Sequence, residues 1–216
     1  MIFDLHIHSK YSVHDCLEEI PKIIETAKKA GLSGIAICDH NSIEGSCEAL
    51  AIAPKGLLII PGIEVSSADG HIICLGVNEK IRRDLSAEKT IKRVHDLGGI
   101  AIAAHAYDYF RSGVGDLSYK LDFDAIEVNG HCLWGNTKAA KAAIEHGKPI
   151  VGGSDAHALN GIGTIATETD AKTVAELLAN IKTGNCGPRL RKNKVSLKIS
   201  ILADKVCRKY NLARKL

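Results

Sequence analysis

Residues 34–38 read GIAIC, and this stretch decides the fold class of the chain. A strand with one face in water alternates apolar and polar side chains, but every residue here is apolar or small. A continuous run of this kind is typical of a strand buried on both faces, as in a parallel sheet. Residues 100–104 (IAIAA) and 150–152 (IVG) repeat the pattern. The sequence therefore predicts a parallel sheet covered by helices.

Helical patterns alternate with these strands along the chain. Helices are expected at residues 17–30, 42–51, 86–97, 137–146 and 171–183, and further strands at 2–8, 57–65, 71–77, 123–128 and 163–167. In the first helix apolar residues recur at helical spacing and Gly31 is a stop signal. Pro61 and Gly62 predict a bend within one strand. The alternation indicates an α/β fold, and the repeated units favour a barrel over separate domains.

Composition sets limits on the class of protein. The 216 residues are 45% hydrophobic and 25% charged, which fits one globular domain and excludes disorder through high charge. A net charge of +3 gives little support for a nucleic-acid partner. The segment 189–216 holds many Lys and Arg and few acidic residues, so we expect a domain of residues 1–185 and a basic C-terminal tail of residues 186–216. An amphipathic helix over 196–209 is expected to dock on the domain.

Targeting signals and cysteine usage indicate a cytoplasmic protein. No stretch is long enough to span a membrane, and the chain begins with a strand pattern instead of a secretory signal. The seven cysteines are scattered and include no CxxC motif. Reduced thiols are therefore expected, and a cysteine-based zinc site is not supported.

Polar side chains gather at or just beyond the ends where the predicted strands finish. The residues there are His6, His8, Asp39, His40, Glu64, His105, Asn129, Asp155 and His157. The amino ends of the strands carry no comparable set. Barrel enzymes build their active sites at the carboxyl ends of the strands, so this asymmetry predicts a functional site. His, Asp and Glu without Cys suit Zn, Mn or Fe.

His6 and His8 show why metal ligands are expected. Residues i and i+2 of a strand face the same side, so both imidazoles can point at one metal. Burying such a pair without a partner would be costly, which favours ligands over ordinary core residues. The same reasoning applies to Asp155 and His157. Glu64 is a carboxylate that follows the apolar run of residues 57–63.

Several neighbouring residues have alternative roles. Asp39 could bind a metal itself or orient His40 from behind. Either His14 or Asp15 could reach back to the site from the loop after the first strand.

Other residues depart from the pattern of strand ends. His71 begins a strand, and His131 lies just beyond Asn129. His95 and His146 fall within predicted helices and are assigned as ordinary surface or core residues. Lys10 and Arg111 lie in loops after candidate ligands, where each could bind phosphate or be a solvated surface charge.

The candidate ligands occur in recognisable motifs. These are residues 4–9 (DLHIHS), 39–41 (DHN), 61–64 (PGIE), 70–76 (GHIICLG), 103–105 (AAH) and 153–157 (GSDAH). In this order they resemble the motifs of the PHP (polymerase and histidinol phosphatase) domain, over residues 2 to 183. The size and the last motif look most like the stand-alone phosphoesterase branch, similar to the TrpH-like proteins. Ala106, where the family often has proline, and the residues Val13-His14-Asp15 depart from the common pattern.

The resemblance implies a distorted seven-stranded, TIM-like (β/α) barrel with two or three divalent metal ions. On that pattern His6, His8, Glu64 and Asp155 would hold one metal. Glu64 would bridge to a second, with His105 and, as one option, His131. His40 and His157, with His14 or Asp15, would hold a third.

The implied reaction is hydrolysis of a phosphate ester. Metal ions polarise phosphoryl oxygens and generate hydroxide from bound water at neutral pH, so metal-bound water, and no single side chain, is the expected nucleophile. The substrate would be a small phosphomonoester, a nucleotide or an oligonucleotide end, and the basic tail leaves nucleic acid as a partner. Two alternatives are a non-catalytic subunit of an RNA-processing complex and a metal-dependent amidohydrolase.

Overall fold

The computed structural model describes residues 1–13, 15–132 and 134–190, and the strands in it form two five-stranded mixed sheets. The first sheet contains, in spatial order, β10 (Gly187–Leu190), β9 (Ile165–Glu168), β1 (Ile2–Ile7), β2 (Gly34–Ile37) and β3 (Leu58–Ile60). The second contains β4 (Gly62–Ser67), β5 (Gly70–Leu75), β6 (Ile100–Ala103), β7 (Ala125–Asn129) and β8 (Ile150–Gly153). The apolar runs that predicted buried strands are β2, β6 and β8, and each is buried along its whole length.

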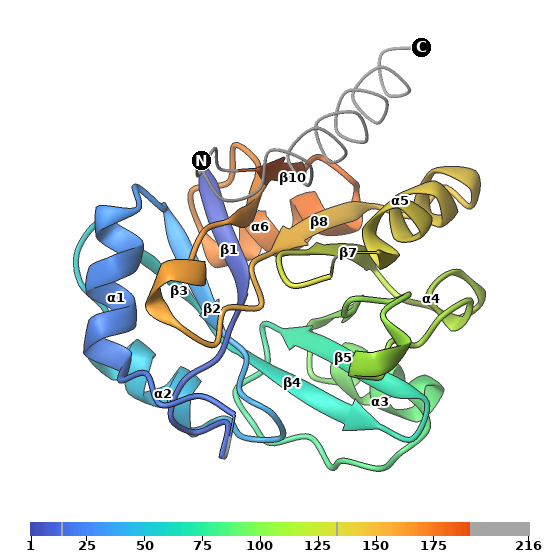
Figure 1. The fold of residues 1–216 in the computed structure, drawn as a ribbon, viewed down its shortest axis with the longest axis horizontal. Helices are drawn as coiled ribbons and strands as arrows, with labels where there is room; N and C mark the ends of the chain where they lie inside the picture. The colour runs from blue at the N-terminus through green and yellow to red at the C-terminus, as the bar shows by residue number, and fades with distance from the viewer. Residues whose placement is uncertain (14, 133, 191–216) are drawn as a thin grey trace.

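Helices connect and cover these strands (Figure 1). They are α1 (Ile20–Lys29), α2 (Glu44–Ala51), α3 (Ala87–Asp96), α4 (Leu117–Lys120), α5 (Gly135–Glu145) and α6 (Val174–Lys182), with short 3-10 turns η1 (Tyr109–Arg111) and η2 (Leu159–Gly161). None of the helices in the described ranges is long and apolar enough to cross a membrane. The predicted helices and strands within the described residues occur in the expected order, with boundaries displaced by a few residues, whereas α4 and β10 were not predicted.

Helix α1 shows how local sequence sets these boundaries. It begins at Ile20, three residues after the predicted start, because Glu19 keeps an extended backbone and Pro21 occupies the first turn, where a missing N–H is harmless. Its apolar stripe, which includes Ile23 and Ala27, is buried against the sheet. Gly31, with φ +71°, follows the end of the helix in the left-handed conformation that glycine adopts readily.

Pro61 marks the place where the chain leaves one sheet and enters the other. The predicted strand 57–65 is divided there into β3, which pairs parallel with β2, and β4, which pairs antiparallel with β5. Proline has no N–H for a ladder, so a break at this position is expected. The bend predicted from Pro61 and Gly62 is confirmed.

The prediction of a seven-stranded barrel is not confirmed in that form. The described residues contain ten strands in two sheets and no closed, continuous ladder. The sheets adjoin through two isolated parallel bridges, Ile7 with Ala156 and His40 with Glu64. Antiparallel pairing of β5 and β9 with their neighbours interrupts the repeated β/α order on which the barrel was predicted. Both bridges lie at the carboxyl ends of β1, β2 and β8, where the candidate ligands were expected.

The predicted C-terminal tail begins with a strand. Within 186–216, β10 pairs antiparallel with β9, and Arg189 forms an ion pair with Glu168. The first sheet therefore extends at least to Leu190, beyond the predicted domain boundary at residue 185. The helix predicted at 196–209 lies outside the described residues, and the cysteines described are all free thiols.

Candidate metal centre

The strand ends bring the candidate ligands into one cluster. His6 lies near the end of β1 and His8 just after it, Glu64 lies within β4, and Asp155 follows β8. All four of these side chains are buried. They are polar groups withdrawn from water at the junction of the two sheets.

Four ligand atoms converge on one point. His6 Nε2 lies 3.0 Å from His8 Nε2 and 3.5 Å from both Glu64 Oε2 and Asp155 Oδ1. His8 Nε2 lies 3.5 Å from Glu64 Oε2 and 3.1 Å from Asp155 Oδ1. Two nitrogens and two oxygens therefore face the same small space, as the first predicted ligand set requires.

A second group surrounds the other side of Glu64. Its Oε1 atom lies 3.2 Å from His105 Nε2 and 3.2 Å from His71 Nδ1, and its Oε2 atom lies 2.8 Å from His40 Nδ1. Ligand atoms of His40, Glu64 and His71 all lie within 4.8 Å of one another. Glu64 thus stands between two groups of ligands, and His71 belongs to the second.

A third group contains His40, His157 and Asp15. Asp15 Oδ2 lies 3.1 Å from His40 Nε2 and 2.9 Å from His157 Nε2. The rings of His8 and His157 stack with their centroids 4.2 Å apart. Of the two alternatives for this position, Asp15 is brought to the cluster, while His14 lies outside the described residues.

The cluster contains atoms that its own members leave unsatisfied. His40 Nδ1, Glu64 Oε2, His71 Nδ1, His105 Nδ1 and Asp155 Oδ1 are buried and lack a hydrogen-bond partner of acceptable geometry. Unpaired buried polar atoms are costly in a folded protein. The donor set of imidazole and carboxylate groups, several of them unpaired, fits several divalent cations.

Charge within the cluster shifts the protonation of its members. Burial opposes the charged form of Glu64, but His6, His105 and His40 outweigh it and hold the pKa of Glu64 well below its usual value. Burial likewise opposes ionisation of Asp155, yet His6 and His8 keep its pKa well below the usual value. Both carboxylates are therefore ionised, as metal ligands must be.

His105 and Asp155 adopt backbone conformations that are uncommon for residues other than glycine. Their φ angles are +31° and +54°. Such strain persists only where the surroundings impose it, and it concentrates at functional sites. His105 lies in the turn that follows β6, and Asp155 lies between the end of β8 and the bridge at Ala156.

Glu127 is a buried residue of the site that the sequence reading did not identify. Its Oε1 atom lies 2.9 Å from His6 Nδ1, and its Oε2 atom accepts hydrogen bonds from the backbone N–H of His105 and the side-chain amide of Asn129. A carboxylate on the far nitrogen of a histidine fixes the ring and its tautomer. The available signal was the i, i+2 pair Glu127 and Asn129 in an apolar strand.

Asp39 lies behind the cluster. Its carboxylate accepts hydrogen bonds from the backbone N–H and hydroxyl of Ser9 and from the hydroxyl of Ser12, and Ser12 Oγ lies 2.9 Å from His8 Nδ1. Of the two predicted alternatives, the structure places Asp39 in a supporting position, and the histidine it supports through Ser12 is His8. Burial raises the pKa of Asp39, whereas its hydrogen bonds oppose that shift.

The remaining candidates separate into two kinds. Arg111 reaches the site, because its guanidinium pairs with Asp155 and lies 3.5 Å from Asn129 Oδ1. His131 stacks on His157 with centroids 5.5 Å apart and can share a ligand group with Asp155. Lys10 instead pairs with Glu19 and Glu48 at the surface.

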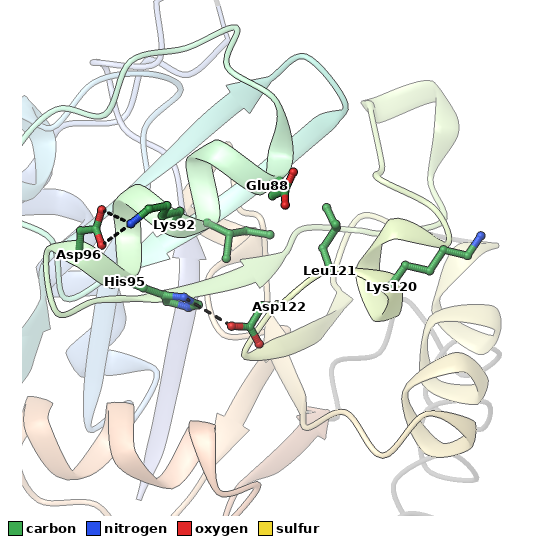
Figure 2. A pocket seen from close by; sticks show the side chains of 8 residues that line it. Glu88, Lys92, His95, Asp96, Lys120, Leu121 and Asp122 are labelled. Atoms are coloured by element: carbon green, nitrogen blue, oxygen red, sulfur yellow. Dashed lines mark hydrogen bonds and ion pairs between the residues drawn. The ribbon is translucent and has the colours of Figure 1, made fainter.

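His95 and His146 lie away from the cluster. His95 Nε2 lies 2.8 Å from Asp124, and His146 stacks on Tyr119. His95 lines a pocket of about 480 Å³ between α3 and the segment 120–122. Figure 2 shows the side chains that line it. Its lining contains the ion pair of Lys92 with Asp96 and none of the clustered ligands, so its size does not make it the candidate site.

Comparison with known proteins identifies the family. The model of the PHP domain matches residues 4–152, and the model described as PHP-associated matches residues 134–186. The uncharacterized protein MJ1587 of Methanocaldococcus jannaschii is 39% identical over 135 residues, which are 58% of this chain and 79% of that protein. The chain belongs to the PHP domain family.

Two solved structures share the fold. A two-domain protein from Bacteroides vulgatus, which contains a predicted PHP-like metal-dependent phosphoesterase, superposes with a TM-score of 0.74 and 17% identity, over 88% of this chain and 65% of that one. A lesion-specific endonuclease from Pyrococcus furiosus superposes with a TM-score of 0.67 and 20% identity, over 95% and 70% of the two chains. At these identities the likeness establishes the PHP type of α/β fold.

Proposed function

We propose that the chain is a phosphoesterase that hydrolyses phosphate esters with two or three divalent metal ions, Zn, Mn or Fe. One observation carries this proposal: histidine and carboxylate atoms from both sheets converge at the junction, and several of them have no hydrogen-bond partner. The Bacteroides relative, with its predicted phosphoesterase, supports the reaction class. Placement in the stand-alone, TrpH-like branch belongs to the same proposal, and a cytoplasmic location stays a prediction.

The geometry suggests how the ligands would be shared. His6, His8, Glu64 and Asp155 would hold one ion. Glu64 would bridge to a second ion, which we assign to His105 and His71, because both lie 3.2 Å from Glu64 Oε1.

The third ligand group would contain His40, His157 and Asp15, because Asp15 lies within 3.1 Å of both imidazoles. The resemblance implied His131 as a ligand together with Glu64 and His105. We instead group it with Asp155 and His157, because its ligand atom lies within 4.8 Å of theirs.

The protein's own groups would prepare the substrate. When bound, divalent ions polarise the phosphoryl oxygens and supply a nucleophile from water. Arg111 is a partly exposed guanidinium beside Asp155, and a guanidinium can bind two phosphoryl oxygens at once. Glu127 fixes the ring of His6, and Ser12 fixes that of His8, so both imidazoles are oriented in advance.

The test compares two histidine variants loaded with metal. His8→Ala should reduce turnover of a generic phosphomonoester or diester to the background rate, because it removes a nitrogen from the centre of the cluster. His146→Ala is the matched control, because His146 stacks on Tyr119 away from the site. Near wild-type turnover by His8→Ala would refute the proposal.

The same assay separates the alternatives. Hydrolysis of amides but not of phosphate esters would identify an amidohydrolase. Purified protein without bound metal or activity would favour a non-catalytic subunit.

A further inference from the structure

Three exposed aromatic side chains stand on two loops beside the metal centre. Tyr109 and Phe110 belong to η1, after β6, and Trp134 precedes α5, after β7. Phe110 is fully exposed, Trp134 is 91% exposed and Tyr109 is 66% exposed. The chain has only three Phe, five Tyr and one Trp. Three of the nine aromatic residues are therefore exposed to water on these two loops, outside the hydrophobic core.

The two loops are packed against each other. A side chain added at Gly135 would lie 2.8 Å from the backbone carbon of Tyr107, so the start of α5 approaches the loop after β6 closely. Asn129 Oδ1 accepts a hydrogen bond from the N–H of His131 and lies 3.5 Å from the guanidinium of Arg111. The loops that carry the aromatic residues are thus neighbours in the fold.

Both loops also reach the metal centre directly. Arg111, the neighbour of Phe110, pairs with Asp155. His131, three residues before Trp134, shares a potential ligand group with Asp155 and His157. The two aromatic loops therefore border the place where the phosphate of an ester would bind.

A cation lies beside Tyr109, the sequence neighbour of Phe110. The ammonium of Lys138 lies 4.3 Å from the centroid of Tyr107 and 5.9 Å from that of Tyr109. Flat aromatic faces next to cations suit a ligand that alternates flat rings with phosphates. Proteins bind single-stranded nucleic acids with this combination of stacking and charge.

We propose that Phe110 and Trp134 form a base-stacking subsite, and that the phosphate ester hydrolysed at the cluster carries nucleobases, as at the end of a single-stranded oligonucleotide. The inference rests on the proposed phosphoesterase function and narrows its substrate class. Stacking on an aromatic side chain does not depend on base identity, because every base presents a π face.

A fluorescence titration tests the subsite without requiring turnover. Trp134 is the single tryptophan of the sequence, so intrinsic tryptophan emission reports on this position alone. An oligothymidine tetranucleotide added to the metal-loaded protein should quench it in the first seconds after mixing. The same tetranucleotide with abasic residues should bind about 5- to 100-fold more weakly and quench little.

Two variants test the role of each ring. Phe110→Ala should weaken the oligothymidine titration about 5- to 100-fold. Trp134→Ala should lower the ratio of kcat/KM for the base-bearing ester to kcat/KM for the abasic ester by a similar factor. Ile52→Ala, which truncates an exposed apolar side chain after α2, is the matched control and should leave both quantities at their wild-type values.

Three results would overturn the subsite. The first is equal quenching of Trp134 emission by the abasic oligonucleotide, and the second is no quenching by oligothymidine at the highest concentration. The third is quenching that depends on protein concentration alone, which would assign the rings to contact between copies of the chain. Base-dependent quenching by a protein that hydrolyses no phosphate ester would uphold the subsite and refute the proposed reaction. Phosphate-ester turnover that is unchanged in both Phe110→Ala and Trp134→Ala would uphold the proposed reaction and refute the subsite.

Discussion

Glu127 orients three groups of the candidate site with two oxygens. Oε1 faces the ring of His6, and Oε2 accepts from the backbone of His105 and from Asn129. In Glu127→Gln, an amide NH2 in the place of Oε2 would face two hydrogen-bond donors. An amide NH2 in the place of Oε1 would donate to His6 Nδ1 and leave the ring proton on Nε2, the atom that faces the cluster, where it would block metal binding. We expect metal affinity to fall about 10- to 100-fold, measured by competition with a chelator of known affinity.

The control for this prediction is Glu145→Gln. Glu145 is an exposed helical residue that pairs with Lys141, so its neutralisation should leave metal affinity unchanged. Wild-type affinity in Glu127→Gln would mean that Glu127 only supports the fold of β7.

Residue patterns predicted the cluster unevenly. His6 and His8 were identified because a polar pair at i, i+2 in an apolar strand is unusual. Glu127 and Asn129 form the same pattern. Candidate ligands were expected at strand ends, however, and Glu127 lies within its strand. Alternation shows which side chains share a face, but it does not show which other strand that face meets.

Strand direction explains why His71 was difficult to assign. It begins its strand, whereas ligands were expected at strand ends. Because β5 runs antiparallel to β4, the start of β5 lies beside the end of β4, and His71 pairs with Ser66. A short apolar run does not reveal its own direction in a sheet. The α/β alternation was therefore predictable, but the antiparallel strands that replace a closed barrel were not.

His71→Ala tests this placement. If His71 completes the group with His40 and Glu64, the variant should retain about one metal ion fewer per chain than the wild type and lose turnover. Metal content after gel filtration measures the difference, with His146→Ala as control. An unchanged metal content would place His71 outside the metal ligands.

The first turn of α2 is packed directly against the residues that support His8. A side chain at Gly45 would lie 2.0 Å from Asp39 Oδ2 and 2.7 Å from Ser9 Oγ. Glycine to alanine inside a helix normally stabilises by about 0.5–1 kcal/mol. Here we expect Gly45→Ala to destabilise by about 1–3 kcal/mol, because the buried site cannot accept the added methyl group.

Denaturant unfolding measures this effect. Cys47→Ala, in the exposed part of the same helix, should change the free energy of unfolding by about 0.5 kcal/mol or less. Turnover by Gly45→Ala should also fall, since displacement of Asp39 releases Ser12 and the ring of His8. Stabilisation by Gly45→Ala would contradict the close contact.

At the scale of the whole molecule, the metal centre lies where the two sheets meet. Its ligands come from strands of both sheets and from the segments that follow them, and among the described residues two isolated bridges join the ladders there. Metal binding should therefore stabilise the entire fold. Free metal at about 100 times its Kd contributes about 2.7 kcal/mol, which for a protein of this size corresponds to a Tm increase of roughly 5–11 °C.

Chelation should reverse that increase in a single cooperative transition, which differential scanning calorimetry would record with and without added metal. Loss of metal leaves His40 Nδ1, Glu64 Oε2 and Asp155 Oδ1 buried without a partner, so both sheets should also exchange amide hydrogens faster. His8→Ala should show a smaller metal-dependent change in Tm, and His146→Ala the full change. If chelation of the metal-loaded protein left its Tm unchanged, the two sheets would be held together by their packed cores alone.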